Sequence, residues 1–142
     1  MSIFFHKENV SFSTDEELIL NWIKESVKLL GFTVGELSII FCSDDYLKKI
    51  NIEHLNHDYF TDVITFDYSK KNLLIGDIYI SIDRVKENAE TYNASFNKEL
   101  FRVIIHGVLH LCGLNDKTME EKTQIRLKEN ELLSTINWKT GF

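Results

Sequence analysis

Two kinds of hydrophobic spacing follow one another along the chain, and they predict its secondary structure. Alternating or continuous apolar residues, typical of strands, occupy residues 2–10, 36–42, 62–68 and 73–82. Apolar residues at intervals of three and four, with capping residues nearby, indicate amphipathic helices. These helices are expected from a Ser13 or Thr14 cap to Gly31, from Ser43 to about His54, from about Asp83 or Arg84 to Tyr92, from about Asn97 to Leu111, and from about Met119 to Thr135.

The order of these elements predicts an α+β fold. We expect a small mixed or antiparallel sheet of about four strands, covered by helices. Residues 69–72 have the composition of a turn and would join the last two strands as a hairpin. Because no repeat, low-complexity tract or Gly/Ser-rich linker interrupts the sequence, residues 1–142 are expected to form a single domain.

Composition narrows the function classes. Hydrophobic residues make up 44% and charged residues 27%, which is typical of a globular protein. No apolar run is long enough to span a bilayer and the N-terminus lacks a signal-peptide pattern, so we expect a cytoplasmic protein without a membrane partner. A net charge of −6 argues against strong non-specific binding to nucleic acid. This net charge is compatible with a local basic patch, or with docking on a protein partner that delivers RNA.

The candidate chemistry is concentrated at the end of the fourth predicted helix, in His106-Gly-Val-Leu-His110-Leu-Cys-Gly113-Leu-Asn-Asp116. Histidines four residues apart share one face of a helix, so His106 and His110 can bind one ion. Gly113 lets the chain leave the helix and fold back, which would bring Asp116 as a third ligand. Three protein ligands with one open position are typical of catalytic zinc. The alternative is that both histidines are ordinary core or surface residues and that Gly113 only ends the helix.

The residue after the first histidine argues against one class of metalloenzyme. Peptidases with the H-E-x-x-H pattern use its glutamate as the general base. This chain has Gly107 there, which carries no proton acceptor. A protease mechanism of that kind is therefore not expected.

The chain contains three separate motifs in this order: residues 51–66 (NIEHLNHDYFTDVITF), Gly76-Asp-Ile78, and the histidine segment that begins at His106. Together these three segments resemble the YbeY family of bacterial endoribonucleases. The resemblance covers roughly residues 40–130 and implies a zinc-dependent, single-strand-specific endoribonuclease of ribosomal RNA maturation and ribosome quality control. It also implies one zinc ion on three ligands, single-stranded rRNA as substrate, and the ribosome or proteins of its small subunit as partners.

The chain departs from the family pattern at three positions. Asn115 and Asp116 stand where the family usually has an aspartate and the third zinc-binding histidine, and a carboxylate oxygen can bind zinc at a similar distance. Leu55 stands where the family usually has an arginine suited to binding a phosphate. The positive charge lost at Leu55 has four candidate replacements in the sequence: His54, His57, Arg84 and Arg102.

Further acidic residues are candidates for supporting roles. Asp62 precedes a predicted strand and is either a partner of a ligand imidazole or a turn residue. Gly76 lies within an apolar strand, which indicates a bulge or a close backbone approach, and Asp77 beside it is at least as plausibly structural as catalytic. Glu99 is expected on a solvated helix face rather than as a proton acceptor. The charges of the final helix, Glu129 among them, are also expected to form a solvated face.

The leading hypothesis is a single-domain endoribonuclease in which His106, His110 and Asp116 hold zinc and form the catalytic centre. One alternative is a ribosome-associated assembly factor whose metal is structural or vestigial. Another is a metallohydrolase acting on a peptide or a small phosphoester, of which Gly107 disfavours the peptide version.

Overall fold

Four strands form one mixed sheet in the order β1-β2-β4-β3, in the computed structural model, which describes residues 2–138. Strands β1 (Ser2–Glu8), β2 (Thr33–Cys42) and β4 (Leu73–Ser81) run parallel to one another. Strand β3 (Val63–Asp67) pairs antiparallel with β4, to which the predicted hairpin joins it. The mixed four-stranded sheet expected from the sequence is therefore confirmed.

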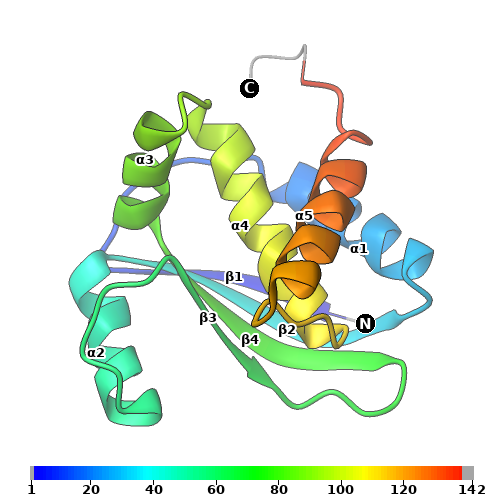
Figure 1. Cartoon of the computed structure of the whole chain (residues 1–142), viewed down its shortest axis with the longest axis horizontal. Helices are drawn as coiled ribbons and strands as arrows, with labels where there is room; N and C mark the ends of the chain where they lie inside the picture. The colour runs from blue at the N-terminus through cyan, green and yellow to red at the C-terminus, as the bar shows by residue number, and fades with distance from the viewer. Residues whose placement is uncertain (1, 139–142) are drawn as a thin grey trace.

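The helices also lie where the spacing of apolar residues predicts them. Their bounds are α1 Glu16–Leu29, α2 Asp44–Leu55, α3 Ile82–Thr91, α4 Phe96–Leu111 and α5 Met119–Leu133. Helices α1, α4 and α5 share the main hydrophobic core with one face of the sheet, whereas α2 covers part of the other face (Figure 1). None of the helices within residues 2–138 has the length and apolar character needed to cross a membrane.

Helix α4 is the central helix of this arrangement. It contacts α1, α3, α5 and two strands, and most of its residues from Leu100 to Leu111 are buried. Gly107 lies against the sheet, where an added Cβ would come within 2.8 Å of Cγ2 of Ile78. A glutamate at position 107 would thus point into the sheet, so the packing of α4 explains why this position holds glycine.

Gly76 in β4 allows the end of α4 to lie close to the sheet. A Cβ at this position would be 2.5 Å from the carbonyl oxygen of Phe66 and 3.1 Å from Cδ2 of Leu111. This confirms the close backbone approach predicted for Gly76. The irregularity in the strand pairing lies elsewhere, between Val34 and Glu36 of β2.

We expect Gly76→Ala to lower the free energy of unfolding by about 1–3 kcal/mol, because the new methyl group overlaps a backbone oxygen that cannot rotate away. Urea denaturation of the purified variant measures this loss. Ser38→Ala on the neighbouring strand β2 is the control, and we expect it to stay within about 0.5 kcal/mol of the wild type. Equal stability of Gly76→Ala and the wild type would contradict the close approach.

Candidate metal centre

The end of helix α4 returns the chain toward its own histidines. Cys112 caps the helix and Gly113 takes a left-handed conformation with φ +95°. The N–H groups of Gly113 and Leu114 then donate to the carbonyls of His110 and Leu109, each at 3.0 Å. This is the Schellman pattern of helix termination, and it satisfies carbonyls that the helix end would leave unpaired. The residues that follow are thereby brought back beside the last turn of α4.

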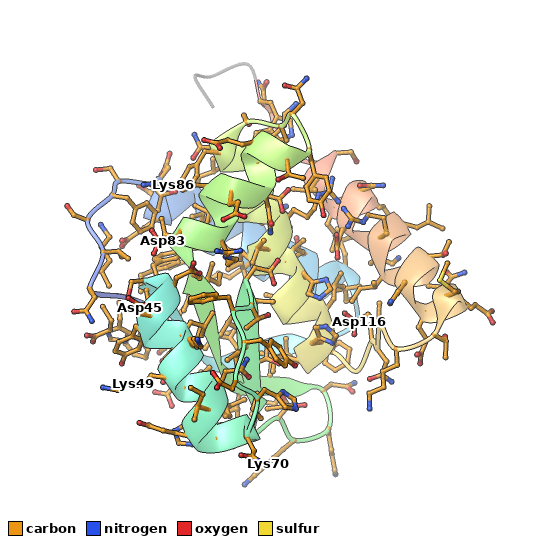
Figure 2. All side chains as sticks on the ribbon, turned by 60° about the vertical axis from the view of Figure 1, so that its left-hand side comes forward. Asp45, Lys49, Lys70, Asp83, Lys86 and Asp116 are labelled. Carbon is orange, nitrogen blue, oxygen red and sulfur yellow. The ribbon has the colours of Figure 1, made fainter. Side chains whose placement is uncertain are left out.

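Three potential ligand atoms converge beside this turn. Nε2 of His106 lies 2.9 Å from Nε2 of His110, and Oδ2 of Asp116 lies 3.3 and 3.5 Å from these two nitrogens. All three residues are partly exposed, and Asp116 lies in the loop between α4 and α5 (Figure 2). The predicted trio is therefore brought together in space.

The hydrogen bonds of the two Nδ1 atoms indicate whether the Nε2 atoms of His106 and His110 carry a hydrogen or a lone pair. Nδ1 of His110 donates to the carbonyl oxygen of Leu114 at 2.9 Å, because a carbonyl can only accept. Nδ1 of His106 donates to the carboxylate of Glu129 at 2.6 Å. When both Nδ1 atoms carry the hydrogen of a neutral ring, both Nε2 atoms present lone pairs to the same point. Lone pairs this close repel one another unless a proton or a metal cation lies between them.

The donor set fits a metal ion. Two imidazole nitrogens and a carboxylate oxygen are ordinary zinc ligands, with bonds of about 2.0–2.2 Å. Adjacent ligand atoms around a tetrahedral zinc ion are then about 3.3 Å apart, close to the separations of 2.9–3.5 Å found here. Residues His106, His110 and Asp116 can thus hold one metal ion and leave a fourth position open.

Glu129 corrects one sequence expectation. The charged residues of the last helix were expected to form a solvated face, but Glu129 is only 2% exposed. Its second oxygen accepts from Nη1 of Arg102 at 3.2 Å. A signal for its burial was present in the sequence, because Glu129 falls on the same helical stripe as the buried Ile125, Leu132 and Leu133.

The surroundings of His106 favour positive charge. Burial alone lowers the pKa of His106, but the hydrogen bond and charge of Glu129, together with Asp116 and Asp62, outweigh burial. The pKa of His106 therefore lies above its ordinary value. The same negative charges favour a bound cation.

Two other carboxylates lie beside the site. Two roles were open for Asp62, and the first, partner of a ligand imidazole, is filled by Glu129. Oδ2 of Asp62 accepts from Nδ2 of Asn88 at 3.3 Å. Glu99 was expected on a solvated face, but it is 7% exposed, so that expectation is wrong. Burial raises the pKa of both Asp62 and Glu99.

Two clefts open beside the three converging residues, and both are lined by His106 and Asp116. The α5 cleft has a volume of about 520 Å³. Its lining contains three cationic side chains from α4 and α5 (Arg102, Lys122 and Arg126) and, besides Asp116, the carboxylates of Asp62, Glu99 and Glu129. The α2 cleft has a volume of about 320 Å³ and is lined by residues of α2 and the loop after it, including Asn51, Leu55, His57 and Tyr59.

The four candidate replacements for the family arginine are distributed unequally. Arg102 lines the α5 cleft and His57 lines the α2 cleft. Arg84 forms an ion pair with Asp44 at 2.8 Å, and the ring of His54 packs against Phe66. The structure thus leaves Arg102 and His57 as the two of these four that line the clefts.

The fold and the site together define a class of protein: an α+β protein with a potential three-ligand metal centre, open to clefts large enough for a substrate. Comparison with known proteins gives the family. The family model described as Endoribonuclease YbeY matches residues 3–137. The chain therefore belongs to the YbeY family of endoribonucleases, which confirms the resemblance found in three short segments.

Individual relatives agree over nearly the whole chain. A protein of Christiangramia forsetii named Endoribonuclease YbeY is 47% identical, with 95% of this chain and 94% of that protein covered. A protein of the same name from Parabacteroides distasonis is 42% identical, with 96% of each covered. A solution structure from Thermotoga maritima has a TM-score of 0.65 at 27% identity and covers 97% of this chain and 99% of that one.

We expect Gly113→Ala to lower the free energy of unfolding by about 1–2 kcal/mol, because a side chain strains the left-handed conformation. Nothing lies within 4 Å of the added Cβ, so the loss would report backbone strain rather than a clash. Urea denaturation in the presence of a chelator removes any contribution from bound metal. Gly113→Asn is the control and should lose less, since asparagine tolerates this conformation. Equal losses in both variants would contradict the assignment.

Proposed function

We propose that this protein is a zinc-dependent endoribonuclease that cleaves single-stranded regions of ribosomal RNA during maturation, with His106, His110 and Asp116 as its zinc ligands. The observation that carries this proposal is the convergence of two imidazole nitrogens and one carboxylate oxygen within 3.5 Å of one another. A site with three protein ligands keeps one position for water or substrate, as catalytic zinc sites do. Residues 1–142 would act as a single domain.

The chain's own residues have distinct tasks in this mechanism. Glu129 and the carbonyl of Leu114 hold the two imidazoles so that both Nε2 atoms face the centre. When bound, zinc supplies Lewis acidity, which makes water a better nucleophile and stabilises charge that develops on a phosphoryl oxygen. Arg102, Lys122 and Arg126 line the α5 cleft beside the centre and can bind the phosphates of the RNA backbone.

The wider role in ribosome quality control, and contacts with the ribosome or its small-subunit proteins, are proposed from family membership. The charge distribution supports such contacts. A chain with net charge −6 gains little from non-specific attraction to RNA, so a protein partner that presents the RNA would help to recruit it. A substrate of this kind places the action of the protein in the cytoplasm.

Metal content and RNA cleavage together test the proposed function. We expect about one zinc ion per wild-type chain by plasma mass spectrometry. His110→Ala and Asp116→Ala should each lose most of the zinc and the cleavage of single-stranded RNA, because two ligands hold zinc poorly. His6→Ala, at an exposed histidine of β1, is the matched control and should keep both.

Two results would contradict this proposal. Wild-type protein without bound metal would remove the zinc site. Wild-type protein that binds zinc but does not cleave single-stranded RNA would favour the alternative of an assembly factor with a structural metal.

Glu129→Gln tests how the ligands are oriented. We expect zinc affinity to fall about 10- to 100-fold, because a ligand histidine loses the carboxylate that fixes its ring and increases its basicity. Competition with a fluorescent chelator measures this affinity. Glu131→Gln makes the same change at an exposed position of the same helix and should leave zinc affinity unchanged. Equal affinities of both variants would show that Glu129 does not support the metal.

A further inference from the structure

His57 and Tyr59 form an aromatic pair at the mouth of the α2 cleft. Their rings are stacked, with centroids 5.2 Å apart and an interplanar angle of 17°. The hydroxyl of Tyr59 also lies 3.0 Å from Nδ1 of His57, within hydrogen-bond distance. Tyr59 is nevertheless 54% exposed, so a large flat surface faces solvent beside the candidate metal centre.

The backbone that carries this pair is fixed. Asn51 of α2 is only 1% exposed, and its Nδ2 donates to the carbonyl of Tyr59 at 3.0 Å. Its backbone carbonyl accepts from the N–H of His57 at 3.1 Å, after a turn in which Asn56 has φ 55°. Because the loop is already held in place, a ligand that stacks there would lose little affinity to ordering the loop.

The next aromatic residue along the loop is engaged differently. The ammonium of Lys48 lies 4.7 Å from the centre of the Phe60 ring, and the guanidinium of Arg84 lies 5.2 Å from it. Phe60 thus has two cations of the protein as neighbours, which further anchors the loop. Tyr59 is the residue whose exposed ring borders the cleft.

The chemistry of the α2 cleft differs from that of the α5 cleft. Within the described part of the chain, neither lysine nor arginine lines the α2 cleft, and its outer wall contains Leu55 and Tyr59. The cationic side chains line the opposite side, in the α5 cleft. Carboxylates line both clefts as well: Asp62, Glu99, Asp116 and Glu129 in the α5 cleft, and Asp62 and Asp116 in the α2 cleft. The α5 cleft is the side that offers cations to phosphates, and the exposed ring of Tyr59 makes the α2 cleft the side that offers a stacking surface.

From this arrangement we infer that His57 and Tyr59 form a stacking platform for one base of the RNA strand. The inference rests on the proposed endoribonuclease function and adds to it the site that holds a base next to the scissile phosphate. Proteins that bind single-stranded RNA commonly stack unpaired bases on aromatic side chains. A base inside a duplex is already stacked between its neighbours, so the platform would favour single-stranded RNA. Leu55, where the family usually has an arginine, lines the same cleft.

Three substitutions in the zinc-loaded enzyme test the platform. We expect Tyr59→Ala to lower kcat/KM for a short single-stranded RNA about 5- to 100-fold, the range that loss of one base–aromatic stack produces. Tyr59→Phe keeps the ring and should stay within about twofold of the wild type. Tyr92→Ala removes a tyrosine that is 69% exposed on another surface and should leave kcat/KM unchanged. Zinc content and thermal midpoint, measured for every variant, separate loss of the platform from damage to the metal centre or the fold.

Base-deleted RNA makes the test specific. A series of oligonucleotides, each lacking one base, should contain a position whose deletion lowers kcat/KM of the wild type by about the same factor as Tyr59→Ala. That deletion should have no further effect on Tyr59→Ala, because the stack is already absent.

The outcomes separate the platform from the proposed function. If the wild type cleaves RNA and Tyr59→Ala cleaves it equally well, the platform is wrong and the endoribonuclease proposal stands. Independent effects of the substitution and of every base deletion would also overturn the platform. If Tyr59→Ala cleaves free RNA normally but no longer binds the ribosomal small subunit, the aromatic pair contacts a protein and the inference fails. A wild type that neither binds nor cleaves single-stranded RNA would overturn both proposals.

Discussion

The packing of helix α4 against strands β3 and β4 fixes the positions of His106 and His110, two of the three proposed ligands. The helix is buried on several sides, so its rotation about its own axis is set by the core. Gly107 and Gly76 allow the helix to lie close to the sheet, since a Cβ at either position would overlap atoms of the core. With the helix fixed in this way, His106 and His110 face the clefts while the intervening residues face the core. The candidate metal centre thus depends on tight apolar packing on the opposite side of the same helix.

Hydrogen bonds from the Nδ1 atoms of the two histidines set the orientation and tautomer of their rings, which the packing of the helix alone does not determine. A helix can place two imidazoles on one face without deciding which nitrogen carries the hydrogen. The carbonyl of Leu114 decides this for His110, and Glu129 of α5 decides it for His106. Arg102 in turn pairs with Glu129, so the last two helices are joined through the residues that orient the site. The hydrogen bonds from Arg102 and His106 to the buried Glu129 therefore join α4 to α5 and also orient the proposed ligand His106.

The two clefts suggest how the proposed RNA substrate is oriented, with its phosphates on one side of the candidate centre and its bases on the other. Cations line the cleft beside α5, and an exposed aromatic pair borders the cleft beside α2. A nucleic-acid strand has charge along its backbone and flat surfaces on its bases, so the two clefts complement its two sides. Leu55 lines the α2 cleft beside this aromatic pair, so the chain has an apolar side chain where the family usually has an arginine.

The sequence by itself determined the elements, their approximate ends and the three residues that converge at the candidate metal centre, because these follow from local spacing. A period of two or of 3.6 residues identifies strands and helices, and the pair His106 and His110 needs only a helix to share a face. Gly113 marked the turn that returns Asp116, for the same local reason. Tertiary structure decided three features that local spacing cannot determine. They are the strand order β1-β2-β4-β3, the burial of Glu99 and Glu129, and the sides of the candidate centre on which the cations and the aromatic pair lie. Glu129 meets His106 across 23 residues of chain, and only the packing of α5 on α4 brings their side chains together.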